Sequence, residues 1–385
     1  MTVASTRFIT RAFVHREGPE GIAEALRSHL AAFRDHYDWV LVGDDPLLRA
    51  VVARRHEGWL AGWFPVDPSG DLPEMIVSKS SFMAVASQAG IPVPQWRTAQ
   101  SAAAATAAAE EIGYPVVLKK AKSSAGEGVV RAGCSAQVVD AFARLASPEP
   151  VLVQQFLPYQ AGVTEALFDH GRPTCWVSSY MLNCWPNNFS PSSARQVMDH
   201  PQVERILRTI GQTTGLHGFG GFDFLHDATT DDFRVIELHA RTTPGVHLGR
   251  FGGVYFPAAV RALLAGRRHL QRPMPINNGP IISLFPQDLE RVVESGDWHS
   301  LCRTPFTASA WRDIPWSDPA LLLACAQRVA TAAVKGLARH LIRRLRRAGG
   351  PGRPGSNGAT AHVAARSILT NGDPWPAAST AHRPA

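Results

Sequence analysis

Apolar positions in the first eighty residues follow a helical spacing and then form one short continuous run. Residues 19–33 carry apolar side chains at three- and four-residue intervals, which predicts an amphipathic helix. Residues 39–42 are all apolar and end in Gly-Asp-Asp, which predicts a buried strand, a helix N-cap and a helix over 47–55. No G-x-G-x-x-G motif follows, so a dinucleotide site is not expected. We predict a small α/β domain over residues 1–77.

Short strand patterns then alternate with single helices, and glycine or proline closes most of them. This alternation is typical of an α+β fold rather than a doubly wound sheet. Helices are expected at 78–89, 101–112, 136–145, 201–214, 256–264 and 318–347, and strands at 114–120, from 129, and at 151–156, 164–168, 174–180, 218–225, 233–239 and 281–284. From Gly349 onward large apolar residues are nearly absent, which predicts a disordered tail.

Charge is distributed unevenly along the 385 residues. The formal charge of +7, from 39 basic and 32 acidic residues, by itself favours a nucleic-acid partner or an acidic surface. Nine basic residues and a single acid, however, lie from Lys335 onward, so residues 1–334 carry a net charge of −1. The body is therefore near neutral, and no nucleic-acid partner is expected.

The five cysteines are widely spaced and form no C-x-x-C pair, which argues against a zinc site or a disulfide framework. The first residues lack the apolar run of a signal peptide, and no stretch of 18 residues is judged apolar enough to span a membrane. A reducing, cytoplasmic location is expected.

Only five of the 39 basic residues are lysines, and four of them fall between residues 79 and 122. Lys119 ends the strand predicted at 114–120, and a loop of small residues, 123–128, follows it. Bare backbone amides at Ser124, Gly126 and Gly128 can fold over a triphosphate while a lysine neutralises it. A Gly-Ser hairpin with a solvated lysine is the alternative.

The hairpin formed by strands 218–225 and 233–239 collects acids among apolar residues. Strand alternation places Glu237, His239 and Arg241 on one face, together with Val235, and puts Asp223 on the partner strand. Two nearby carboxylates suit a hard divalent ion such as Mg²⁺. The alternative is a half-exposed strand with a salt-bridged polar face.

A third segment, Gln154-Gln155-Phe156-Leu157, ends an apolar strand, where backbone groups can read an adenine edge. Taken alone, this segment is more typical of a buried core strand than of a binding site.

In this order and spacing, the three segments resemble the ATP-grasp superfamily, in the manner of carbamoyl-phosphate synthase and D-alanine–D-alanine ligase. The resemblance covers about residues 78–249 and includes Ser78-Lys79-Ser80, which resembles the entry to the family's nucleotide domain. It implies two α+β lobes that clasp ATP and Mg²⁺, preceded by a domain like the one that usually comes before an ATP-grasp fold. The expected domains are 1–77, 78–275 with a lobe division near 160, a C-terminal extension 276–347, and the tail 348–385.

The resemblance also implies a reaction. ATP phosphorylates a carboxylate, and an amine or a thiol attacks the acyl phosphate, releasing ADP and phosphate. Lys79 and Lys119 are expected to contact phosphates, Asp223 and Glu237 to hold Mg²⁺, and Arg241 to bind the acyl phosphate.

Three departures from the family pattern bear on this expectation. His239 stands where the family has Asn, and imidazole prefers softer metals than Mg²⁺, so Mn²⁺ is an alternative and His239 a candidate ligand. No acid lies beside the adenine segment to reach the ribose, the nearest being Glu165. The amino-terminal lobe is short and leaves no clear substrate set.

Two further features have weaker claims to function. Arg195 follows the loop 183–193 and is a candidate contact to phosphate or substrate, or a solvated arginine. The C-terminal helix joins an apolar stripe to several arginines, which favours docking on an anionic membrane or a protein, or packing on its own domain. A homodimer, a phosphotransferase and a non-catalytic ATP-binding module stay open, and the substrates leave no recognisable mark.

Overall fold

The computed structural model describes residues 17–33, 36–60, 64–69, 71–124, 126–145, 147–267, 270–273, 279–297 and 312–348. The chain divides into two compact units. The larger unit spans residues 14–181 and 196–279, and the smaller one holds residues 1–13, 182–195 and 280–385. The predicted tail and residues 1–13 lie outside the described residues. The predicted domain boundaries stay predictions.

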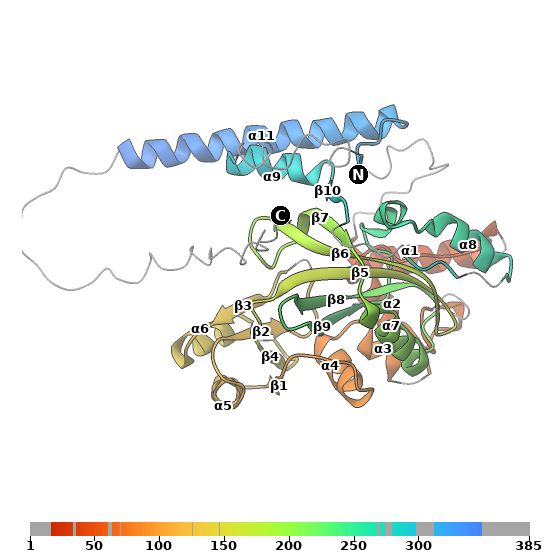
Figure 1. Cartoon of the computed structure of the whole chain (residues 1–385), viewed down its shortest axis with the longest axis horizontal. Coiled ribbons are helices and arrows are strands. Elements are labelled where there is room, and N and C mark those ends of the chain that lie inside the picture. Colours follow the sequence, from red (N-terminus) through yellow and green to blue (C-terminus); the bar gives the residue numbers. More distant parts are fainter. Residues whose placement is uncertain are drawn as a thin grey trace, which may run out of the picture. The chain divides into compact units, whose positions relative to one another are not determined.

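A four-stranded antiparallel sheet in the order β1-β4-β2-β3 forms one part of the larger unit, and α5 and α6 lie beside it (Figure 1). Alanines of α5, with Val116 and Leu118 of β2, fill the apolar layer between the helices and the sheet. Because side chains alternate along a strand, Lys119 faces away from this layer. The elements are β1 (Trp96–Ala99), α5 (Ala102–Ile112), β2 (Val116–Lys120), β3 (Val129–Ala132), α6 (Ser135–Leu145) and β4 (Val151–Gln155).

A second antiparallel sheet of the larger unit contains strands in the order β6-β5-β8-β9. Its strands are β5 (Gln160–Asp169), β6 (Arg172–Cys184), β8 (Gly218–Asp227) and β9 (Asp232–His239), and β7 (Ser192–Met198) passes from the smaller unit into the larger one. Phe222 and Phe224 of β8 enter a core shared with Leu48, Met83 and Leu207 from three helices. This core therefore joins the first eighty residues to the β8–β9 hairpin.

The remaining elements of the larger unit follow the helical spacing of their apolar residues closely. Asp44 caps α2 through a 2.8 Å hydrogen bond from the amide of Leu47. The elements are α1 (Gly18–Phe33), α2 (Asp45–Ala53), η3 (Gly58–Leu60), α3 (Leu72–Met75), α4 (Lys79–Gln88), α7 (Pro201–Thr214), η4 (Val246–Gly252) and α8 (Phe256–Leu264).

The strand predicted at residues 39–42 is wrong. These residues adopt no strand, and Leu41 is 49% exposed. Trp39 instead stacks on Phe219 at 5.6 Å, and Thr242 donates to the carbonyl of Val42. The apolar run serves to cover the start of β8 rather than to extend a sheet.

The smaller unit contains β10 (Ile281–Ser283), α9 (Gln287–Ser295) and α11 (Pro319–Ala348), and α11 lies along α9 (Figure 1). Gly336 permits the close approach, since a Cβ there would lie 2.5 Å from Val293 O. Arg328 of α11 pairs with Glu290 at 2.9 Å.

The expectation that no stretch could span a membrane is corrected by α11. By length and composition alone, residues Pro319–Ala338 suffice to cross a bilayer, with a mean hydropathy of 1.3 and only 17% of the segment buried. Helices in the cores of soluble proteins meet the same criterion, so this is weak support for a membrane span.

Candidate functional site

Lys79 begins α4 and connects three elements of the larger unit. The hydroxyl of Ser78 accepts the amide of Ser81 and so caps the helix, which makes Lys79 its first residue. The Lys79 ammonium lies 2.8 Å from Glu237 Oε1 and donates to the carbonyl of Ser123 at 2.7 Å. This one side chain thus joins the helix, the small-residue loop and β9.

Lys119 lies on the face of β2 that turns away from α5 and α6, and its side chain is 7% exposed. Burial, the largest influence, lowers the pKa of Lys119 to about 8, against the raising effect of Glu237. No described residue accepts a hydrogen bond from its ammonium group. A buried ammonium in this state is suited to an incoming anion.

The β8–β9 register sets the two predicted metal carboxylates directly opposite each other. Asp223 pairs with Glu237, and Gly221 pairs with His239. A β-bulge follows Asp223, because Phe224 then pairs with Val235 and leaves Ile236 as the extra residue. The prediction that Val235 shares the face of Glu237 is therefore wrong, since the bulge turns Val235 into the core.

His239 and Asp223 form a hydrogen-bonded pair, with Nε2 2.9 Å from Oδ1. Burial, the largest influence, acts to lower the pKa of His239, but the Asp223 carboxylate raises it above its ordinary value. Carboxylate oxygens are the donors that Mg²⁺ prefers, so Asp223 and Glu237 fit this ion. His239 is already engaged with one of those carboxylates, and its role as a metal ligand stays a prediction.

Arg241 follows β9 and is held by an acid from the beginning of the chain. Its Nη2 donates to Asp45 Oδ2 at 2.7 Å, and its Nε donates to Asp45 Oδ1. Although burial acts to raise the pKa of Asp45, the hydrogen bonds and charge of Arg241 hold it below the usual range. A pocket beside this pair is lined by Asp45, Arg49, Lys79, Ser123 and Glu237, among others.

The loop that follows Lys119 depends on glycine at two positions. Gly126 and Gly128 have φ angles of +76° and +73°, which other residues rarely adopt. The carbonyl of Gly128 accepts the amide of Lys120, and Ser124 O accepts the amide of Glu127. The loop therefore closes back on β2, next to Lys119, and its predicted phosphate contacts stay predictions.

The predicted adenine segment lies at the end of β4. Gln154 shares the face of Lys119, is 2% exposed, and donates through Nε2 to Met83 Sδ at 3.3 Å. The amides of Gln155 and Phe156 donate to Gln95 O and Pro115 O. Adenine recognition by this segment, Leu157 included, stays a prediction.

The structure brings together six of the predicted site residues, namely Lys79, Lys119, Asp223, Glu237, His239 and Arg241. Arg195 belongs to the smaller unit, where its Nε donates to Ser192 Oγ at 2.8 Å, and its predicted role stays untested.

Sequence reasoning missed Asp45. The sequence pattern accounts for the Asp44-Asp45 pair only as a helix cap, and capping needs just Asp44. The second acid was the available signal for an additional role.

The family described as ATP-grasp domain matches residues 84–243. The formate-dependent phosphoribosylglycinamide formyltransferase of Wolinella succinogenes is 22% identical over 224 residues, which cover 54% of this chain and 56% of that protein. The chain thus spans little more than half the length of this curated relative.

Solved structures share the fold. Biotin carboxylase from Campylobacter jejuni, in a β,γ-ATP complex, superposes with a TM-score of 0.54 at 16% identity, covering 67% of this chain and 60% of that one. The biotin carboxylase domain of Hydrogenobacter thermophilus 2-oxoglutarate carboxylase, with MgADP and bicarbonate, gives 0.53 at 14% identity, covering 68% and 60%. An N5-carboxyaminoimidazole ribonucleotide synthetase with ADP gives 0.51 at 18% identity, covering 68% and 67%.

Proposed function

We propose that the chain, which matches the ATP-grasp domain family over residues 84–243, is an ATP-dependent ligase. It activates a carboxylate as an acyl phosphate and joins it to an amine, releasing ADP and phosphate. A thiol acceptor is the variant of the same reaction. One relative is a formate-dependent formyltransferase and one structural relative was solved with bicarbonate, and both favour a small carboxylic acid as the activated substrate.

One observation carries the proposal. Lys79 reaches Glu237 at 2.8 Å, and Glu237 stands opposite Asp223 across the β8–β9 register. Lys119 is close enough for both carboxylates to influence its pKa. Two buried lysines beside two facing carboxylates are suited to bind a polyphosphate together with a divalent cation. The phosphates compensate the positive charge of the lysines, and the cation compensates the negative charge of the carboxylates.

The residues divide the reaction between them. Lys79 and Lys119 bind and orient the phosphates, and Asp223 and Glu237 hold Mg²⁺, with Mn²⁺ as the alternative. When bound, the cation neutralises phosphate charge during the transfer. The guanidinium of Arg241 stabilises the oxygens of the transferred phosphoryl group, an electrostatic role that fits its planar fork. Because Asp45 accepts hydrogen bonds from Nε and Nη2 of Arg241, the remaining N–H donors of the guanidinium keep a fixed direction.

The direct test is an ADP-release screen of paired carboxylates and amines, run with Mg²⁺ and with Mn²⁺. A ligase requires both substrates and joins them. A phosphotransferase, the second candidate, would leave a stable phosphorylated product with no amine present. Melting curves with and without nucleotide provide the binding control, and Lys119→Ala should remove the nucleotide-dependent shift. No shift in the wild type would exclude both activities.

A non-catalytic ATP-binding module is the third candidate, favoured by His239 and by the absence of an assigned acid for the ribose. A module of this kind should show a nucleotide-dependent shift in melting temperature, but its ATP turnover should not exceed that of the Glu237→Ala variant.

We further propose a cytoplasmic location and docking of α11 on an anionic membrane surface. Leu323, Val334 and Leu337 of this helix are more than 60% exposed, and five arginines follow within residues 339–347. A homodimer is proposed as the oligomeric state, because one structural relative is a dimer.

A further inference from the structure

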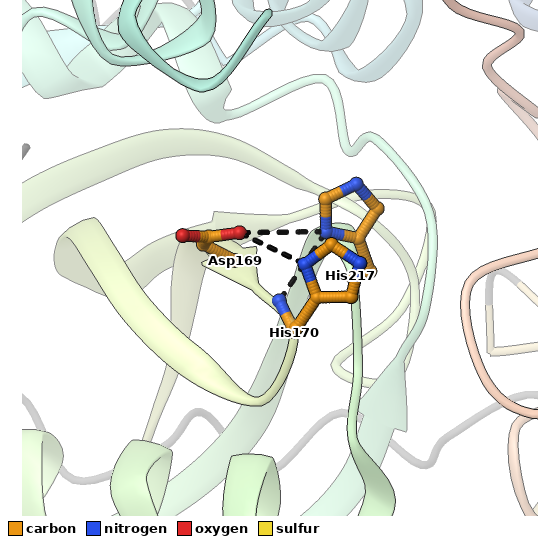
Figure 2. A group of neighbouring side chains, drawn as sticks. All are labelled: Asp169, His170 and His217. Atoms are coloured by element: carbon orange, nitrogen blue, oxygen red, sulfur yellow. Dashed lines mark hydrogen bonds and ion pairs between the residues drawn. The ribbon is translucent and has the colours of Figure 1, made fainter. Parts of the chain in front are cut away.

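Three side chains meet at the turn between β5 and β6, away from the site described above. Asp169 Oδ1 lies 3.0 Å from His170 Nδ1 and 4.0 Å from His217 Nδ1 (Figure 2). The three ligand atoms all lie within 4.8 Å of one another. The two imidazole rings are tilted by 32°, with centroids 4.0 Å apart.

Hydrogen bonding fixes the form of His217. The amide of His170 donates to His217 Nδ1 at 3.2 Å, so this nitrogen carries a lone pair and no proton. His217 therefore presents to Asp169 the unprotonated nitrogen that a metal ion requires.

We propose that Asp169, His170 and His217 bind one Zn²⁺ ion. Tetrahedral zinc with bonds of about 2.0–2.1 Å keeps its ligand atoms roughly 3.3 Å apart, and the distances of 3.0 and 4.0 Å fall on either side of this value. Small side-chain movements suffice to bring the ligand atoms to this spacing. The zinc ion then takes the place of the His170 amide as the partner of His217 Nδ1. The proton that His170 donates to Asp169 leaves for solvent, and water completes the coordination at the exposed His170.

The frame around these ligands is already built. Gly171 donates its amide to Leu216 O at 2.7 Å, which joins the turn to the segment that enters β8. A Cβ on Gly211 of α7 would lie 1.8 Å from Gly171 O, so the turn also packs backbone to backbone on that helix. Arg172 lies 3.4 Å from the other oxygen of Asp169 and helps to orient the carboxylate. Zinc would therefore link the β5–β6 turn to the residues before β8, two segments that are already in contact.

A second histidine pair, His200 and His226 with Asp231, shows why proximity alone is not enough. His200 Nδ1 accepts the amide of Gln202 and caps α7, so its Nε2, 2.8 Å from Asp231, carries the proton. A metal ion would have to remove that proton from a ring whose other nitrogen is already an acceptor. In the turn cluster, by contrast, His217 directs an unprotonated Nδ1 toward Asp169.

The zinc site is separate from the nucleotide site. His217 comes directly before β8, and Asp223 lies on β8, six positions later. Six residues of extended strand separate the two side chains by about 20 Å. Zinc at the turn is thus not the catalytic cation, and its occupancy does not depend on the proposed reaction.

The test is calorimetric titration of Zn²⁺ into the full chain, made without a histidine tag, stripped with chelator and saturated with Mg-ATP. We expect one Zn²⁺ per chain. His170→Asn keeps the left-handed turn residue, at φ +45°, while removing the imidazole, and His217→Gln removes the second ring. Each should weaken Zn²⁺ binding by about tenfold or more. Visible absorption of Co²⁺ in place of Zn²⁺ should show a tetrahedral spectrum that both variants lose.

The matched control is His247→Asn, an exposed histidine elsewhere in the larger unit, which should bind Zn²⁺ like the wild type. Unchanged affinity in both His170→Asn and His217→Gln would overturn the proposal. So would an equal loss in His247→Asn, or a loss in His226→Gln alone. If nucleotide binding itself fails, zinc binding measured without ATP still decides the matter.

Discussion

Asp45, at the start of α2, accepts two hydrogen bonds from the guanidinium of Arg241, 196 positions further along the chain. Both side chains are largely enclosed, with Arg241 13% and Asp45 23% exposed. Such a planar two-point contact fixes the direction of the remaining guanidinium donors. We interpret Asp45 as a positioning residue for the arginine proposed to bind the transferred phosphoryl group.

Replacing Asp45 by Asn should lower kcat by roughly 10- to 100-fold and leave the KM for ATP nearly unchanged, because the arginine is misdirected while the lysines remain. Asp45→Glu should restore part of kcat. Leaving the enclosed guanidinium without its full hydrogen-bond partner should also cost about 1–3 kcal/mol of unfolding free energy. Steady-state kinetics and denaturant unfolding measure both effects, with the exposed Glu20→Gln as control. Equal rises in KM and falls in kcat for both variants would contradict the positioning role.

Sequence patterns located most helices and strands of the larger unit to within a few residues, since capping serines, closing glycines and apolar spacing are local signals. They failed where a neighbour decides the outcome. The bulge after Asp223 turns Val235 into the core, and periodicity alone cannot show it. β7 was missed because its buried Ser193 is polar and is satisfied by Asp288 at 2.8 Å.

The same limit applies to the candidate site. The lysines and acids were expected together because an ordered motif set resembles a known family. Asp45 could not be joined to Arg241, because nothing in the sequence specifies a contact between positions so far apart. Local patterns therefore identify which residues carry chemistry better than they identify which residues orient them.

The pH dependence of nucleotide binding should depend on Lys119. Its pKa is lowered to about 8, so above that pH the free protein must take up a proton to present a cation to ATP. We expect ATP affinity to fall as pH rises through 8, by up to about tenfold per pH unit. Calorimetry from pH 7 to 9.5 measures this, and Lys119→Met should bind weakly with a flat profile. A steep profile in Lys119→Met would assign the titration to another group.

Stability should change in the opposite direction. The unfolded chain keeps the Lys119 proton up to its ordinary pKa of 10.5, so burying the charge costs most below pH 8 and least near pH 10.5. Lys119→Met should therefore be more stable than the wild type at pH 7, by roughly 1–3 kcal/mol, with the gap closing toward pH 10. A destabilised variant at pH 7 would contradict this account of the lysine.

Metal preference should follow His239. Its ring holds Asp223 at 2.9 Å, and imidazole favours softer ions than Mg²⁺. His239→Asn should raise the ratio of Mg²⁺- to Mn²⁺-supported ADP release severalfold, because an amide oxygen replaces the imidazole nitrogen. The control is His247→Asn. An unchanged ratio in His239→Asn would remove His239 from the metal site.

The loop after Lys119 should tolerate no side chain at Gly128. A Cβ there would lie 3.0 Å from Lys120 Cγ, and the φ of +73° disfavours any residue with a Cβ. Gly128→Ala should cost about 1 kcal/mol or more and raise the KM for ATP more than it lowers kcat. Gly133→Ala is the matched control, since its added Cβ would approach only the flexible end of Gln137, at 3.4 Å. Equal kinetics for the two variants would exclude a phosphate-covering role for the loop.

Docking of α11 should depend on salt and on anionic lipid. The helix Pro319–Ala348 contains no acidic residue, and its arginines are concentrated near its end. The full chain should cosediment with phosphatidylserine-containing vesicles, fail to bind phosphatidylcholine alone, and dissociate at high salt, because screening weakens each surface contact. Arg343→Glu with Arg347→Glu should abolish binding, whereas Arg205→Glu with Arg261→Glu, on α7 and α8, should not. Retention after a high-salt wash would indicate insertion of the apolar segment and contradict surface docking.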